Sequence, residues 1–91
     1  MMRKELDDIM QIIIDYRDAQ GWQDNDRPNN LSKSIFIEST ELLKNFDALS
    51  ESYCLENIKE ELADILMYTL AYIHDLELSA EEIILERIKS L

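Results

Sequence analysis

Apolar side chains recur at intervals of three and four residues along most of the chain, a spacing typical of amphipathic helices. A first helix is expected from about Arg3 to Gln20, and Gly21 is a plausible stop for it. The segment 21–30 is rich in Asn, Asp, Gly and Pro, so it is expected to form a loop. The apolar stripe of this first helix consists of Leu6, Ile9, Met10, Ile13 and Tyr16.

The same spacing predicts three more helices. The second is expected to start near Asn30 or Ser32, either of which can cap it, and to run to about Leu49. The third covers 55–76, and a short fourth follows Ser79, because "SAEE" fits a capping box with Ser79 as the cap. Short connections between long helices favour an antiparallel four-helix bundle-type protomer that forms a single helical domain over residues 1–91. The stripes of the second and third helices are Leu31, Ile35, Leu42 and Phe46, and Ile58, Leu62, Ile65, Leu66, Thr69 and Ile73.

The composition supports an all-α fold, since the 91 residues include one Gly and one Pro and are 46% hydrophobic. A domain of this size buries a smaller fraction of its surface than a larger one does. Assembly with further copies of itself, as a dimer or a dimer of dimers, would supplement such a core. Oligomerisation is therefore expected.

The charge narrows the class of partner. The formal net charge is −11, which disfavours binding to nucleic acids and to anionic membranes, although a nucleotide can bind if divalent metals neutralise both partners. One cysteine excludes an internal disulfide framework. The N-terminus has acids where a signal peptide needs an apolar segment, and the longest apolar run, 65–73, falls short of the about 20 residues that span a bilayer. A soluble, cytoplasmic protein is expected.

Two helices carry acids within apolar runs. In "FIESTELLKNF" Glu38 and Glu41 are three residues apart, and in "EELADILMYTL" Glu61 and Asp64 are three apart. Each pair shares one face of its helix, so side-by-side packing would bring four carboxylates together. These faces contain Ser34, Glu38, Glu41 and Asn45, and Asn57, Glu61, Asp64 and Tyr68.

Clustered carboxylates repel one another unless cations balance them, and the only basic residue near these faces is Lys44. Bound metal is the simplest remaining neutraliser, and oxygen ligands favour Mg²⁺, with Mn²⁺ as the alternative. A di-iron site is excluded, because it needs Glu-x-x-His motifs and the sole histidine, His74, has Ala71 three residues earlier. A second interpretation stays open at this point, in which the acids are solvated faces of amphipathic helices.

The combined motifs resemble the MazG-like nucleotide pyrophosphohydrolases of the all-α NTP pyrophosphatase superfamily. The resemblance spans about 13–80 and rests on "GWQDNDRPNNLSKSIFIESTELLKNF" and "EELADILMYTLAYIHDLEL". It implies Mg²⁺-dependent hydrolysis of a nucleoside triphosphate, with deoxynucleotides as the expected substrates, to a monophosphate and pyrophosphate, in nucleotide-pool cleansing. It also implies a homodimer or homotetramer.

The resemblance implies catalytic metal ligands at Glu38, Glu41, Glu61 and Asp64. For Trp22 it implies stacking on a nucleobase, and the alternative is packing of its loop on the bundle. Asn30, Lys44 and Tyr68 complete the expected substrate contacts, with Lys44 as the phosphate candidate. Tyr68, Tyr72 and Ile73 are expected to help a neighbouring chain complete the site. Relatives often have Phe-His where this chain has Asn25 and Asp26, so the base is left open.

Two rival functions remain at the level of sequence. Phosphoribosyl-ATP pyrophosphohydrolase shares the fold and the acidic motifs, but the Trp22 loop and "RPNNL" make it the weaker match. A non-enzymatic helical module for oligomerisation and partner binding also fits the amphipathic stripes. Thermal stabilisation by a triphosphate that depends on Mg²⁺ would separate an enzyme from such a module.

Overall fold

The computed structural model describes residues 5–22, 28–45 and 55–91, and helices account for most of them. The all-α expectation is confirmed, since no strand occurs in these three segments. The helices are α1 (Leu6–Gln20), α2 (Pro28–Lys44), α3 (Leu55–Asp75) and α4 (Ala80–Ser90).

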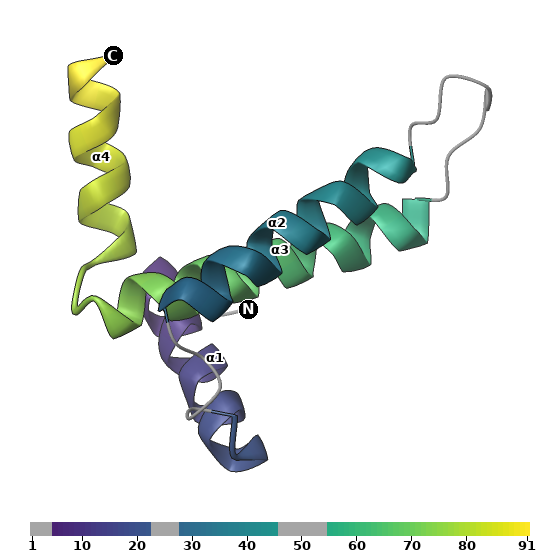
Figure 1. The fold of residues 1–91 in the computed structure, drawn as a ribbon. Coiled ribbons are helices and arrows are strands. Elements are labelled where there is room, and N and C mark those ends of the chain that lie inside the picture. Colours follow the sequence, from purple (N-terminus) through teal and green to yellow (C-terminus); the bar gives the residue numbers. More distant parts are fainter. Residues whose placement is uncertain (1–4, 23–27, 46–54) are drawn as a thin grey trace.

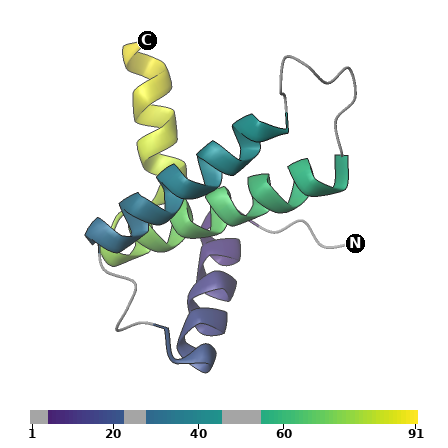
Figure 2. The same ribbon diagram turned by 45° about the vertical axis from the view of Figure 1, so that its right-hand side comes forward.

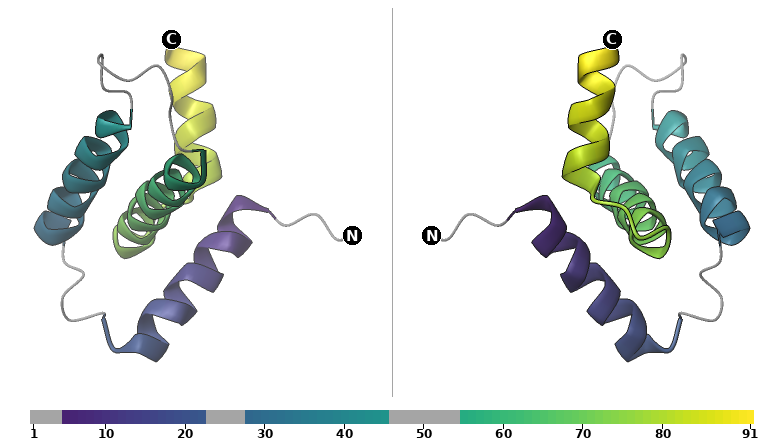
Figure 3. Two further views of the ribbon diagram at one scale, coloured as in Figure 1. Left: turned by 90° about the vertical axis from the view of Figure 1, so that its right-hand side faces the viewer. Right: turned by 90° about the vertical axis from the view of Figure 1, so that its left-hand side faces the viewer.

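Helices α2 and α3 lie side by side and antiparallel, as Figures 1 and 2 show. Helix α1 crosses α3 steeply on the side away from α2 (Figure 3). Helix α4 leaves the C-terminal end of α3 and extends away from the α2–α3 pair. Helix α3 is therefore the central element, and it contacts each of the other three.

Two buried clusters hold the helices together. Met10, Leu70 and Ala80 join α1, α3 and α4, while Ile14, Leu31 and Ala71 join α1, α2 and α3. Leu31 is 1% exposed, and Ile13, which is only partly buried, packs against both clusters. Burial of apolar surface at these crossings is the main force that fixes α1 across α3.

The helix boundaries differ from the expected ones mainly at α2. This helix begins at Pro28, so neither Asn30 nor Ser32 is its cap, and both lie within its first turns. Proline is favoured at the first helical position because the missing N–H has no partner there in any case. Helix α3 ends at Asp75, one residue early, and Ser79 caps α4 as expected by accepting a hydrogen bond from the Glu82 N–H. The expected features at Asn25, Asp26, Phe46 and Leu49 lie outside the described residues.

Helix α1 ends in a Schellman motif that sets the direction of the following residue. Gly21 has a φ of 73°, a conformation that residues with a Cβ rarely adopt. Its N–H donates to the Asp18 carbonyl, and the Trp22 N–H donates to the Arg17 carbonyl, both at 3.1 Å. The predicted stop at Gly21 is confirmed, and the position of Trp22 is fixed by the backbone of α1.

The start of α4 is held by an acid from α1. The Asp7 carboxylate accepts hydrogen bonds from the Ser79 hydroxyl at 2.9 Å and from the Ala80 N–H at 3.2 Å. Ala80 itself is fully buried. The negative charge of Asp7 also complements the positive N-terminal end of the helix dipole. These contacts anchor α4, the rest of which is largely exposed.

Several large apolar side chains remain exposed on α2, α3 and α4. None of the helices described here is long and apolar enough to cross a membrane. The exposed residues include Phe36, Ile37, Leu43, Leu62, Leu66, Ile84, Leu85 and Ile88.

Replacing Asp7 with alanine tests the anchor of α4. Loss of both hydrogen bonds should lower the free energy of unfolding by about 1–2 kcal/mol, the size of a lost N-terminal cap. Amide hydrogens of α4 should then exchange faster than those of α2 and α3. The matched control is Asp8→Ala, which removes an exposed acid from the same helical turn. Equal stability and equal exchange in the two variants would contradict the anchor.

Candidate metal centre and adjoining pocket

Three carboxylates from two helices meet at the contact between α2 and α3. Glu38 comes from α2, and Glu61 and Asp64 come from α3, where their three-residue spacing places them on one face. One oxygen from each of the three lies within 4.8 Å of the others. The structure thus brings together three of the four acids selected from the sequence.

The crowding of these acids has an electrostatic cost. The pKa of Glu38 is raised from 4.5 to about 7, first by its hydrogen bond with Glu61, then by burial and by the charges of Glu61, Asp64 and Glu41. Near neutral pH Glu38 therefore retains a proton in a large fraction of molecules. Oxygen Oε2 of Glu61 is buried and has no hydrogen-bond partner within the part of the chain that is described.

The donor set fits a hard divalent cation. Carboxylate oxygens are the preferred ligands of Mg²⁺ and Mn²⁺, and a cation would balance the charge that raises the pKa of Glu38. The unpartnered Oε2 of Glu61 offers a lone pair for such an ion. No histidine or cysteine belongs to the cluster, which makes it unlike a zinc site.

Glu41 occupies a different position from the other three acids. It is not part of the close cluster, and its Oε1 accepts a hydrogen bond from Lys44 Nζ at 3.2 Å, which makes an ion pair. Both side chains are well exposed, so this pair contributes little to stability. Its charge still contributes to the raised pKa of Glu38, which places Glu41 near the rim of the cluster.

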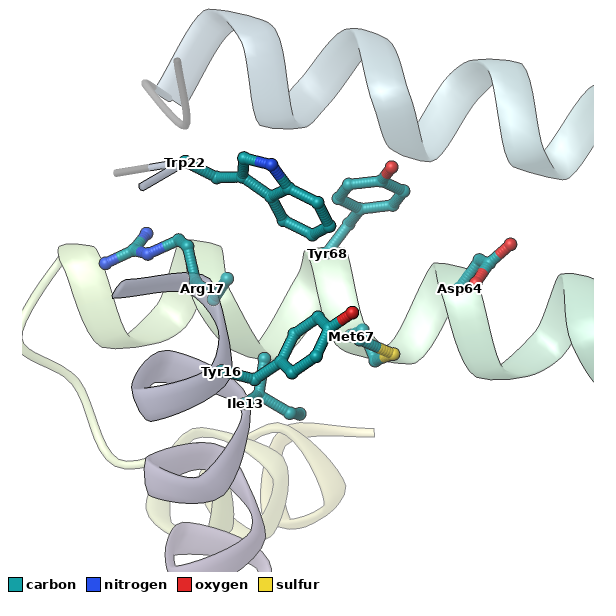
Figure 4. A pocket seen from close by; sticks show the side chains of 8 residues that line it. Ile13, Tyr16, Arg17, Trp22, Asp64, Met67 and Tyr68 are labelled. Carbon is teal, nitrogen blue, oxygen red and sulfur yellow. The ribbon is translucent and has the colours of Figure 1, made fainter. Parts of the chain in front are cut away.

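A pocket of about 260 Å³ adjoins the cluster and shares Asp64 with it (Figure 4). Its two walls come from the C-terminal part of α1 and from α3. Trp22 and Tyr68 lie near each other in Figure 4, with Tyr16 and Met67 below them. The lining residues are Ile13, Tyr16, Arg17, Trp22, Asp64, Met67, Tyr68 and Ala71.

Of the expected substrate contacts, Trp22 and Tyr68 line this pocket. Trp22 packs edge-to-face on Tyr16, with ring centroids 5.6 Å apart and planes at 78°. Trp22 nevertheless remains 46% exposed, so it both packs on α1 and offers surface to a ligand. Asn30 and Lys44 are exposed on α2 and do not line the pocket.

Sequence reasoning missed the α1 wall of the pocket. The sequence places Tyr16 on the apolar face of the first helix and gives no motif that marks Arg17. Their position in the last turn before Gly21 is the sequence feature that could have revealed Tyr16 and Arg17. The turn at Gly21 brings Trp22 back to this end of the helix. Met67 lies within the apolar run 65–73, where periodicity does not distinguish a pocket residue from a core residue.

Arg17 is almost fully buried and pairs with Asp75 at the end of α3. The guanidinium donates two hydrogen bonds to the carboxylate, from Nη1 at 2.8 Å and from Nη2 at 3.0 Å. Burial alone would raise the pKa of Asp75, but the hydrogen bonds and charge of Arg17, with a smaller effect from His74, hold it below its ordinary value. The pair therefore stays ionised at neutral pH.

The fold is similar to that of a solved pyrophosphatase. The fold matches that of a pyrophosphatase from Archaeoglobus fulgidus DSM 4304, with a TM-score of 0.84, 26% sequence identity, and coverage of 99% of this chain and 91% of that chain. The chain therefore has the fold of a pyrophosphatase. No family model matches the sequence. No curated protein matches it either.

The raised pKa of Glu38 predicts how the metal-free protein responds to pH. The folded state holds this proton more tightly than the unfolded state, so the stabilisation is complete below pH 4.5 and is lost as the pH rises through about 7. In a chelating buffer the melting temperature of the wild type should therefore fall over this window relative to that of Glu38→Gln. If the melting temperatures of the wild type and Glu38→Gln changed equally with pH across this window, the shared proton would be contradicted.

Proposed function

We propose that this protein is a Mg²⁺-dependent nucleoside triphosphate pyrophosphohydrolase that releases a nucleoside monophosphate and pyrophosphate. The observation that carries the proposal is the shared wall at Asp64, which joins a carboxylate cluster to an aromatic pocket. Likeness to a solved pyrophosphatase supports a function of the pyrophosphohydrolase type. Deoxynucleoside triphosphates and a role in nucleotide-pool cleansing belong to the same proposal.

The size of the pocket indicates that different regions of the site would bind the base and the phosphates of the substrate. Ligand pockets that enclose a whole small molecule have volumes of roughly 300–1,000 Å³. The pocket here, about 260 Å³, suits a nucleobase but not a complete nucleotide. The base would lie between Trp22 and Tyr68, and the phosphates would extend past Asp64 to the carboxylates. Asn30 and Lys44 on α2 would meet the outer part of the substrate.

The carboxylates would hold the cation and set its position. Bound Mg²⁺ supplies charge neutralisation on the phosphoryl oxygens and an activated water for attack at the α-phosphorus. Glu61 and Asp64 would both hold the ion, because one face of α3 carries them. Glu38 would lose its proton on binding the cation, and Glu41 at the rim would orient a water or complete the ligand set. Pyrophosphate leaves without a covalent protein intermediate.

A panel of nucleoside triphosphates assayed for pyrophosphate release tests the reaction. Glu61→Gln and Asp64→Asn should each lower turnover on the order of a hundredfold or more, because each removes a charged ligand at the reacting phosphate. The matched control is Glu60→Gln, which neutralises an exposed acid next to Glu61. Full Mg²⁺-dependent turnover in both ligand variants would refute this site.

Thermal shifts distinguish the enzyme from a helical interaction module. A non-hydrolysable triphosphate analogue should raise the melting temperature with Mg²⁺ and should have little effect in a chelating buffer. The Asp64→Asn variant should lose this response while it keeps its helical circular dichroism. Testing phosphoribosyl-ATP beside the nucleoside triphosphates separates the two pyrophosphohydrolase alternatives. Stabilisation that is independent of metal would count against the proposed centre.

We also propose that the chain assembles with further copies of itself, as a homodimer or homotetramer. Phe36 and Leu43 on α2 are each 72% exposed and are seven residues apart, so they form one apolar stripe. Tyr68, Tyr72 and Ile73, which are expected to help a neighbouring chain complete the site, are partly buried and also pack against the core of their own chain. The contact would therefore use the exposed stripe of α2 together with exposed apolar residues of α3.

Sedimentation velocity tests the assembly. The wild type should sediment as a dimer or tetramer, and the double variant Phe36→Ser, Leu43→Ser should shift toward monomer because it removes the apolar stripe. Leu91→Ser is the matched control, since Leu91 is 84% exposed at the end of the chain. An active wild-type monomer would refute the assembly.

A further inference from the structure

We propose that the Arg17–Asp75 pair is a clamp that positions the Tyr16–Trp22 wall of the pocket, and so controls ligand affinity without acting on the carboxylate cluster. Arg17 and Asp75 are positioning residues in this proposal. It deepens the proposed function and rests on it for the identity of the ligand.

The geometry of the pair fixes the orientation of α1 on α3. Two parallel hydrogen bonds, at 2.8 and 3.0 Å, align the plane of the guanidinium with the carboxylate. Such fork-to-fork contacts constrain direction as well as distance. Arg17 is 8% exposed, so water competes weakly for its donors. The partners are 58 residues apart in sequence, so the contact belongs to the tertiary fold.

Arg17 also holds Trp22 through its backbone. Its carbonyl accepts the Trp22 N–H at 3.1 Å in the Schellman motif that Gly21 makes possible. The residue that is tied to α3 by its side chain is therefore tied to Trp22 by its main chain. Tyr16 is its neighbour in sequence and supports the Trp22 ring edge-to-face. Displacement of Arg17 would move both aromatic rings.

The second wall of the pocket comes from α3, the helix that also carries Asp75. Met67, Tyr68 and Ala71 line the pocket from α3, and Asp75 lies one helical turn beyond Ala71. The clamp thus connects the α1 wall to the helix that carries the α3 wall. Figure 4 shows the two walls facing each other, with the Arg17 guanidinium directed away from the aromatic rings. The distance between the walls is set at Asp75.

The chemistry of the pair favours a positioning role over simple stabilisation. Burying an ion pair is often no more stabilising than packing apolar residues of similar volume in its place. What the pair supplies is one defined arrangement of two helices. Two further ionisable side chains lie beside the pair, since His74 Nδ1 is 3.5 Å from Asp75 Oδ1 and Asp18 Oδ1 is 3.8 Å from Arg17 Nε.

The single tryptophan allows a direct test, because all indole fluorescence of this chain comes from Trp22. Asp75→Asn removes the charge, and Arg17→Lys keeps the charge but loses the fork. In both variants acrylamide should quench Trp22 more strongly, by about twofold, and KM for the best nucleotide should rise on the order of tenfold, equivalent to ~1.4 kcal/mol. The value of kcat should stay within about twofold, because the carboxylate cluster is untouched. Glu56→Gln, which breaks an exposed ion pair with Lys59 on α3, is the control.

The outcomes separate the clamp from the proposed function. Wild-type quenching and wild-type KM in a folded variant would overturn the clamp, as would a loss of kcat at constant KM. If Asp75→Asn fails to fold, Arg17→Lys decides by the same criteria. If the wild type hydrolyses no nucleotide, the proposed function fails, and the quenching measurement decides the clamp alone.

Discussion

Electrostatic repulsion across the α2–α3 contact is the constraint around which the site is arranged. Glu38, Glu61 and Asp64 come together because the antiparallel packing of α2 on α3 brings the helix faces that carry them side by side. Apolar burial at the crossings with α1 stabilises that packing. Apolar burial thus offsets the repulsion between the three carboxylates. A bound divalent cation would relieve that repulsion.

Helical periodicity predicts the four helices and places Glu38, Glu41, Glu61 and Asp64 on two helix faces, and three of these acids meet in the structure. Spacing of three residues places Glu61 and Asp64 on one face whatever the tertiary structure is, so the sequence carries that information directly. The relation between Glu41 and the cluster depends on how far α2 slides along α3, which spacing does not specify. Lys44, which the sequence suggests as the phosphate candidate, makes a local ion pair with Glu41.

The pocket wall on α1 depends on information that periodicity does not contain. Tyr16 and Arg17 reach α3 only because α1 crosses it steeply, and the crossing is set by Ile13, Ile14 and the residues they contact. The Arg17–Asp75 pair joins positions far apart in the chain, and no local motif marks it. The start of α2 was misplaced for a simpler reason, since Pro28 was counted with the loop although proline suits a first helical position.

The proton held by Glu38 has a consequence for how a cation enters the site. A ligand carboxylate must be deprotonated, so binding of a metal ion also releases a proton to solvent. Around neutral pH the apparent affinity for the ion would therefore increase with pH. The measured heat of binding would include the ionisation heat of the buffer that takes up the proton. A divalent cation bound here would replace the proton on Glu38 and would relieve the carboxylate repulsion that raises the pKa of Glu38.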